Sequence, residues 1–269
     1  MLTQISSNFA KIERILVPMA KGDSSKIAFN IAREFAKKMQ SEVTALTVKD
    51  MIREVTWSDK VAVVMSAYKE SRDMGIKVIP KIQSAKNIKD GIVKESNSKN
   101  YDLVLMSSRG RTGVSGSVYG NIGDYVLKHS KNTTAVIASK GSKYPYRNIF
   151  VPMSERLNSR KSVYLGAVLS KVLDARFILC DARSFDTKKI HGFTTIMNSE
   201  IWKELDLDFE LRELKGTDLR SSVISSIDDD VTNLLVLGIR PDQYSNVRIN
   251  ADIKRISRES KVDTLLIKR

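Results

Sequence analysis

The sequence predicts an α/β protein with two tandem doubly wound domains, Rossmann-like or flavodoxin-like, each with a mainly parallel five-stranded sheet. Short apolar segments typical of buried strands alternate with amphipathic helical segments along the chain. Such alternation favours right-handed crossovers and a parallel sheet covered by helices on both faces. The same series of segments occurs twice, so we expect an internal duplication.

The duplication is visible where each half begins. The segment KIERILVPM, which ends at Met19, matches YRNIFVPM, which ends at Met153. A later pair, YDLVLMSSRG and TNLLVLGIRP, matches in the same way. Between the halves, the segment KGSKYPY contains the Gly, Ser and Pro that are typical of a linker. We therefore expect one domain at residues 1–141 and a second at residues 142–269, both of a common size.

In the first half, apolar segments bounded by polar residues predict the strands, and apolar residues at helical spacing predict the helices. In the second helix, Val61, Val64, Met65 and Tyr68 are expected on one buried face. The strands are expected at residues 12–18, 42–48, 76–82, 103–106 and 133–138, and the helices at residues 24–39, 59–74, 87–98 and 122–129.

The second half repeats the pattern. Residues 183–198 show no clear period, which favours a loop or a lid. Strands are expected near residues 148–152, 176–180, 207–214, 233–237 and 264–267, and helices near residues 159–173, 198–204, 217–228 and 251–259.

Composition narrows the class of protein. No apolar segment approaches the roughly 20 residues that span a bilayer, and the first residues lack a signal-peptide core, so we expect a cytoplasmic protein without membrane insertion. Cys180 is the only cysteine and is expected in the core of a protein from a reducing compartment. Trp57 and Trp202 are expected to serve packing. The net charge of +14 comes without a dense basic run among aromatics, so we expect no specific nucleic-acid binding.

One strand-to-helix junction of the first half favours an anion. The segment SSRG, residues 107–110, follows a buried strand, and after nine further residues Gly120-Asn121-Ile122 leads into a helix. Glycines let backbone amides approach an anion closely, and a helix N-terminus adds N–H groups and partial positive charge. Arg109 and Arg111 add charge, and Asn121 is a candidate helix cap. In open parallel sheets, ligands bind at such carboxyl ends of strands.

At these residues the chain resembles the universal stress protein family. Nucleotide-binding members carry G-x2-G-x9-G-(S/T) here, where this chain has Ser107, Gly110, Gly120 and Asn121 at the same spacing, followed by GDYVLKHS. The opening ILVPMAKGDSSKIA also resembles the family's VPxDxS start. A second register, Gly110, Gly113 and Gly123, has the same spacing but does not directly follow the apolar strand.

The resemblance implies that the first domain binds an adenine nucleotide: ATP, ADP or AMP. It places the base and ribose near Pro18, Ala20 and the backbone of Val48. It also places the nucleotide near Met19, Met106 and Ser107. It places the phosphates near Arg109, Gly110, Gly120, Asn121 and Ile122.

Three positions depart from the family pattern. Ser107 replaces the first loop glycine, Asn121 replaces the final Ser or Thr, and Ala20 replaces the acidic residue after Val-Pro. Loss of one hydrogen-bonding acid costs about 0.5–1.5 kcal/mol, roughly tenfold in affinity. We therefore expect weakened binding.

The second half departs further. Pro241 occupies a loop position and has no N–H to offer an anion. Asp252 would repel a phosphate and is expected to cap a helix, and Ser154 replaces the acidic residue after Val-Pro. We expect this half to bind no nucleotide.

The sequence thus favours a nucleotide-binding module that acts in stress response or regulates a protein partner. The alternative is an interaction scaffold that needs no nucleotide, and a further alternative is slow ATP hydrolysis. We expect no other enzymatic activity, because the P-loop, nucleophile-elbow and H-E-x-x-H motifs are missing. We expect no metal site, since His129 and His191 lack ligand spacing. The family resemblance suggests that the last strands of the halves pair to form an intrachain pseudo-dimer, and a homodimer of chains is compatible with it.

Overall fold

The computed structural model describes residues 12–21, 24–51, 56–109, 120–141, 143–186, 202, 205–227, 232–239 and 249–268. The chain divides into two compact units. Described residues up to 109 and from 120 to 137 build the first unit, and those from 138 onward build the second. Both units are α/β with parallel strand pairs, which confirms the predicted fold class.

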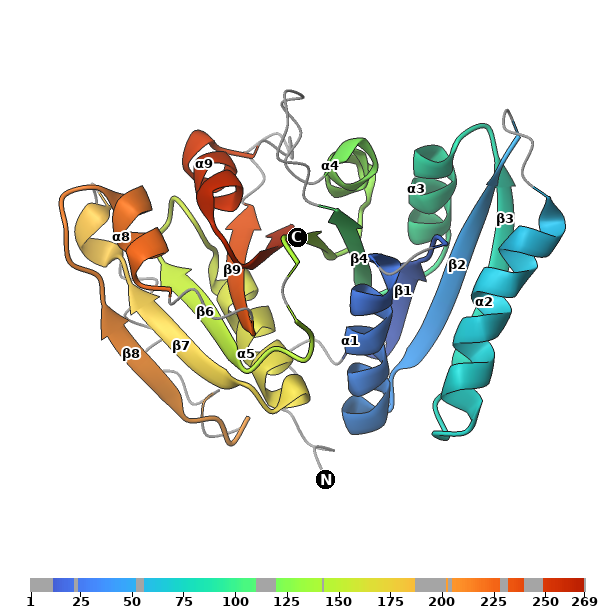
Figure 1. Ribbon diagram of the computed structural model, residues 1–269, viewed down its shortest axis with the longest axis horizontal. Coiled ribbons are helices and arrows are strands. Elements are labelled where there is room, and N and C mark those ends of the chain that lie inside the picture. Colours follow the sequence, from blue (N-terminus) through green and yellow to red (C-terminus); the bar gives the residue numbers. More distant parts are fainter. Residues whose placement is uncertain are drawn as a thin grey trace. The chain divides into compact units, whose positions relative to one another are not determined.

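The first unit has the strand order β3-β2-β1-β4-β5, and its helices are α1 to α4 (Figure 1). Parallel pairing joins β1 to β2 and β4, and β2 to β3. The strands are β1 (Arg14–Pro18), β2 (Glu42–Asp50), β3 (Val78–Ala85), β4 (Leu103–Arg109) and β5 (Thr134–Ser139), and the helices are α1 (Ser24–Met39), α2 (Trp57–Arg72), α3 (Ile88–Ser98) and α4 (Gly120–His129).

The strand order of the first unit creates a switch point beside β1. The chain proceeds from β1 to β2 and β3 on one side, then returns to the other side of β1 at β4. With right-handed crossovers, α1 and α2 cover one face of this sheet and α3 and α4 cover the other (Figure 1). The carboxyl ends of β1 and β4 therefore flank the position where open α/β sheets bind ligands.

The second unit repeats this topology, with the strand order β8-β7-β6-β9-β10. Parallel pairing joins β6 to β7 and β9. The elements are β6 (Asn148–Met153), α5 (Arg160–Leu173), β7 (Arg176–Asp181), a 3-10 turn (Arg183–Phe185), β8 (Phe209–Glu213), α8 (Leu219–Ser225), β9 (Asn233–Ile239), α9 (Ala251–Glu259) and β10 (Asp263–Lys268). Of the predicted loop at 183–198, residues 187–198 lie outside the described residues, and of the predicted helix at 198–204 only Trp202 is described.

The buried strands form the core of each unit, and most predicted core positions are confirmed. Cys180 is 1% exposed, and Trp202 packs against Phe177 and Phe209. Two predictions are wrong. Val61 is 44% exposed, because the buried face of α2 passes through Val64, Ala67 and Ser71 instead. Trp57 is 49% exposed, and the Nζ of Lys49 lies 4.9 Å from its ring centre.

No helix among the described residues is long and apolar enough to cross a membrane.

Candidate functional site

The structure brings many of the sequence-predicted site residues to the carboxyl edge of three neighbouring strands. Pro18 ends β1, and Met19 and Ala20 follow it. Val48 lies near the end of β2, and Met106 and Ser107 lie in the last part of β4. Because β1 pairs with both β2 and β4, these segments lie side by side.

The strand β4 is longer than predicted. It runs to Arg109 instead of ending at Met106, so Ser107 belongs to the strand and is not the first loop residue. Met106 is buried, whereas Ser107 and Ser108 are half-buried. Gly110 and Arg111, like Gly113 of the second register, lie outside the described residues, and Arg109 is described only by its backbone.

Gly120 opens α4 beside the end of β4. Its φ of +73° lies in the left-handed region, where glycine is favoured. Among the described residues, a Cβ built there would meet only the Oγ and Cβ of Ser108, at 3.8 and 3.9 Å. Glycine is therefore favoured here by the backbone angle and not by a lack of space beside Ser108.

The first turn of α4 presents its amides near this edge. Asn121 lies inside that turn and is exposed, so the prediction that it caps the helix from outside is wrong. The first amides of a helix have no partner within the helix. The amides of Asn121 and Ile122 have no hydrogen-bond acceptor within the described part of the chain.

Three hydrogen bonds fix the turn that follows β1. The amide of Met19 donates to the carbonyl of Leu46 at 2.7 Å, and the hydroxyl of Thr47 donates to the Met19 carbonyl at 3.0 Å. The hydroxyl of Ser25, in the first turn of α1, donates to the carbonyl of Ala20 at 2.7 Å. Ala20 itself is exposed and, with a methyl side chain, offers no hydrogen bond.

Val48 is turned away from any ligand at this edge. Its side chain is 4% exposed and packs under α3, where a Cβ built on Gly91 would come within 2.6 Å of Val48 Cγ1. A ligand at the edge of the sheet therefore meets the backbone of Val48 and not its side chain.

Contacts with α3 hold α4 in place. The ring of Tyr125 stacks on His129 with centroids 4.0 Å apart, and the Nζ of Lys89 lies 4.5 Å from the Tyr125 ring centre. A hydrogen bond from Tyr125, assisted by one from Asn87, lowers the pKa of the Asp90 carboxyl. The stack lies within α4, whereas the contacts of Lys89 and Asp90 with Tyr125 join α3 to α4.

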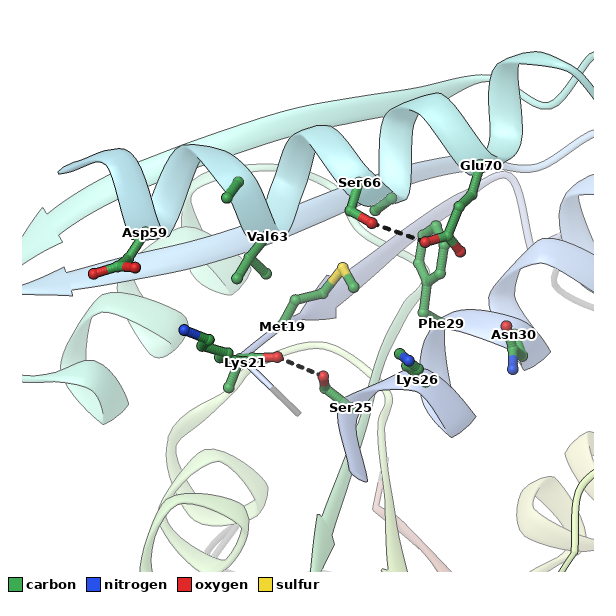
Figure 2. Close-up of a pocket in the computed structure, with 13 residues that line it drawn as sticks. Met19, Lys21, Ser25, Lys26, Phe29, Asn30, Asp59, Val63, Ser66 and Glu70 are labelled. Atoms are coloured by element: carbon green, nitrogen blue, oxygen red, sulfur yellow. Dashed lines mark hydrogen bonds between the residues drawn. The ribbon is translucent and has the colours of Figure 1, made fainter. Parts of the chain in front are cut away.

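A pocket opens next to this edge, on the face covered by α1 and α2 (Figure 2). Its volume is about 260 Å³. Met19 and Ala20 line it together with residues of both helices. The pocket thus shares the turn after β1 with the predicted nucleotide contacts.

In the second unit, the matching edge is closed by its own chain. The turn after β6 brings Leu157 over β9, where the Leu157 carbonyl accepts from the amide of Gly238 at 2.7 Å. Asn158 Nδ2 donates to the carbonyls of Pro152 and Val236 at 2.9 and 3.1 Å. Leu157 and Asn158 are both fully buried. A Cβ on Gly238 would lie 2.1 Å from Ser162 Oγ, so this close approach depends on glycine.

The start of α9 is also closed. Asn250 caps the helix by accepting from the amide of Ile253 at 2.8 Å, and its side-chain amide donates to the Arg156 carbonyl. The prediction that Asp252 is the cap is therefore wrong. Asp252 lies in the first turn and accepts two hydrogen bonds from Arg156, at 2.5 and 2.9 Å. Pro241 lies outside the described residues.

Sequence reasoning missed Ser108 and the pocket. Ser108 lies within the SSRG segment, but its approach to Gly120 depends on the length of β4. A signal for the pocket exists in α2, where the small residues Ala62, Ser66 and Ala67 share one side of the helix.

Comparisons with known proteins identify the relatives of this chain. A model of the universal stress protein family matches residues 11–138. The solved structure of a universal stress protein from Archaeoglobus fulgidus DSM 4304 has a TM-score of 0.68 at 15% identity, covering 97% of this chain and 100% of that chain. A putative universal stress protein from Pseudomonas aeruginosa UCBPP-PA14 has a TM-score of 0.64 at 13% identity, with coverages of 96% and 93%.

A further similar structure is the cytoplasmic domain of a prokaryotic cation chloride cotransporter, with a TM-score of 0.60 at 11% identity and 95% coverage of both chains. A search of curated proteins found no match. At these identities the solved structures show a shared two-domain fold.

Proposed function

We propose that the domain at residues 11–138, which matches a model of the universal stress protein family, binds an adenine nucleotide. The site lies at the carboxyl ends of β1 and β4. The base and ribose lie near Pro18, Met19, Ala20 and the Val48 backbone.

The phosphates lie at the other side of the site, where α4 begins. Gly120 and the amides of Asn121 and Ile122 provide N–H groups and the positive end of a helix dipole, which favour an anion. Arg109 and Gly110 extend this neighbourhood, with Met106 and Ser107 beneath it.

The contrast between the two units carries the proposal. In the first unit, the opening amides of α4 have no acceptor within the described ranges. In the second unit, the α9 amide of Ile253 donates to the capping Asn250, and the β9 amide of Gly238 donates to Leu157. Backbone groups that remain available in only one copy support a ligand for that copy.

The nucleotide binds weakly, and it acts by shifting the equilibrium between two conformational states of the protein. Ala20 supplies no carboxylate for the ribose, which removes about tenfold of affinity. Bound nucleotide favours one state of the domain over another, and a protein partner with different affinities for the two states responds to the difference. Such a role fits stress response or regulation, and it requires no catalysis.

Titration calorimetry with ATP, ADP and AMP tests the proposal. The wild-type chain is expected to bind at least one of them at millimolar concentration or below. The variant Ser108→Asp places a carboxylate beside Gly120, where it repels phosphate, and is expected to bind none. Ser84→Asp, an exposed substitution in β3 of the same sheet, is expected to bind as the wild type does.

Equal binding by Ser108→Asp and wild type would contradict the placement of the phosphates. No binding by the wild-type chain would favour the nucleotide-independent scaffold, which the closed second unit and the loss of the acid at Ala20 also support. Measurement of phosphate release from ATP, with Arg109→Ala as control, checks for hydrolysis. A release rate that depends on Arg109 would contradict a purely binding role.

A further inference from the structure

We propose that the pocket between α1 and α2 is a separate binding site for a small apolar carboxylic acid, whose carboxylate is held by Lys21. The site lies on one face of the first sheet, beside the turn that follows β1 (Figure 2). It does not rest on nucleotide binding at the β1 and β4 edge.

Small side chains create the pocket. Ala62, Ser66 and Ala67 line it from α2, and Ser25 lines it at the start of α1. Larger residues at these positions would fill the space between two neighbouring helices. The resulting volume of about 260 Å³ lies just below the range of about 300–1,000 Å³ for small-molecule sites, so the ligand is small.

The interior of the pocket is apolar. Figure 2 shows Met19 and Phe29 directed toward α2, with Val63 facing them from that helix. Phe29 and Ala67 are both 2% exposed, so these walls are part of the packed structure. An apolar ligand body that covers Met19 and Val63 removes further apolar surface from water, which favours binding.

The two acids that line the pocket already have partners. Glu70 accepts a hydrogen bond from Ser66 Oγ at 2.8 Å, and its other oxygen lies 3.7 Å from the guanidinium of Arg33. Asp59 accepts from Thr56 Oγ1 at 2.8 Å and lies in the first turn of α2, where the helix dipole stabilises its charge. Because both carboxylates are already stabilised, neither favours a cationic ligand.

Two lysines line the pocket, and Lys26 has an interaction partner of its own, so Lys21 is the charge that remains available. It lines the pocket, and its side chain extends toward the Asp59 end of α2 (Figure 2). No acid within the described ranges lies within 4.0 Å of its ammonium group. An unpaired cation at the rim of an apolar pocket favours a ligand with an apolar body and an anionic head.

The matched pair 4-phenylbutyrate and 4-phenylbutanamide tests the site on the full chain. Titration followed by amide NMR shifts is expected to give binding of the acid about three- to tenfold tighter than the amide, since one charge-assisted contact at an exposed rim contributes modestly. The shifted amides are expected in α1, in α2 and in the turn after β1 that carries Lys21.

Two variants test separately the contacts of the ligand's anionic head and of its apolar body. Lys21→Gln is expected to remove the preference for the acid and leave the amide unchanged. Ala62→Phe fills the pocket from an exposed position of α2 and is expected to abolish binding of both probes. Lys69→Gln removes an exposed charge of α2 that does not line the pocket, and is expected to bind as the wild type does.

Equal affinity for acid and amide in the wild type would overturn the role of Lys21. Absence of binding at millimolar concentration, or shifts confined to regions outside α1, α2 and the turn after β1, would overturn the site itself. The Ser108→Asp variant keeps this test independent of the nucleotide proposal. That variant is expected to retain the acid, whereas loss of the acid in it would place the ligand at the β1 and β4 edge.

Discussion

Gly120 lies at the proposed site and has a backbone angle that favours glycine. Its substitution by alanine therefore tests how backbone strain affects both stability and nucleotide binding. Because φ is +73° and the nearest atom of the described residues would lie 3.8 Å from an added Cβ, Gly120→Ala is expected to lower the free energy of unfolding by about 1–2 kcal/mol through the angle alone. The strained start of α4 is also expected to weaken nucleotide binding. Urea unfolding and calorimetry measure the two effects.

Gly75 provides the matched control. It has a similar φ of +67° and lies in the turn after α2, and an added Cβ would meet no atom of the described chain within 4 Å. Gly75→Ala is expected to cost similar stability and leave nucleotide binding unchanged. Equal losses of binding in the two variants would show that the loss reports lowered stability and not the site.

Cys180 makes the stability of the protein depend on pH through burial. Burial raises the pKa of its thiol from an ordinary value near 9 to about 11. Between pH 9 and 11 the unfolded chain has released this proton and the folded chain keeps it, so the unfolded state binds fewer protons and stability falls as pH rises. The stabilising contribution of the protonated thiol is fully present below pH 9. Its loss lowers the free energy of unfolding by about 2–3 kcal/mol above pH 11.

Urea unfolding at several pH values from 8 to 11 measures this slope in wild type and Cys180→Ala. The variant is expected to lose stability less steeply. Burial also raises the pKa values of Tyr101 and Tyr146, which are present in both proteins, so the difference between the two slopes isolates the thiol. Identical slopes would mean that the thiol titrates normally in the folded protein.

At the scale of elements, alternating patterns predicted nearly every described helix and strand, because burial imposes them directly on the sequence. The helix at residues 24–39 was predicted with the bounds of α1. The end of β4 was missed, because Ser107 and Ser108 are polar and half-buried, and the apolar signal stops at Met106. The exposure of Trp57 was misjudged because it depends on where α2 begins relative to Lys49, and the apolar pattern does not show that position.

The candidate site was predictable only in part. Strand ends and a glycine before a helix follow from the sequence, so the neighbourhood of Pro18 and Gly120 was found. The packing of Val48 under Gly91 and the space between α1 and α2 depend on contacts between distant segments, which periodicity does not encode. In the second unit, the sequence predicted a lost site, but not that Asn158 closes it.

Asn158 joins two strands of the second unit, and its removal is expected to be costly. Asn158→Ala leaves the buried carbonyls of Pro152 and Val236 without their donor, which is expected to lower the free energy of unfolding by about 2–3 kcal/mol. Asn30→Ala, a half-buried position in α1, is the control and is expected to change stability little. A loss below about 0.5 kcal/mol in Asn158→Ala would show that water replaces the amide.

At the scale of the whole molecule, a duplicated topology carries two different edges. Both units place a switch point between equivalent strands, β1 with β4 and β6 with β9. The first edge presents helix amides. At the second edge, Asn250 caps the Ile253 amide of α9, the Gly238 amide donates to Leu157, and Arg156 pairs with Asp252. The duplicated fold therefore has two equivalent positions for a ligand site. One of them is closed by its own chain, so we propose a site at the other.

This asymmetry predicts the stoichiometry of the intact chain. Calorimetry is expected to give one nucleotide per chain, since an anion at the second edge would have to displace Arg156 from Asp252 and Leu157 from Gly238. Hydrogen exchange with saturating nucleotide is expected to slow at the ends of β1 and β4 and in α4, and to stay unchanged in β6, β9 and α9. Two nucleotides per chain, or protection in α9, would show that the second edge opens, because only an opened edge frees its amides for a ligand.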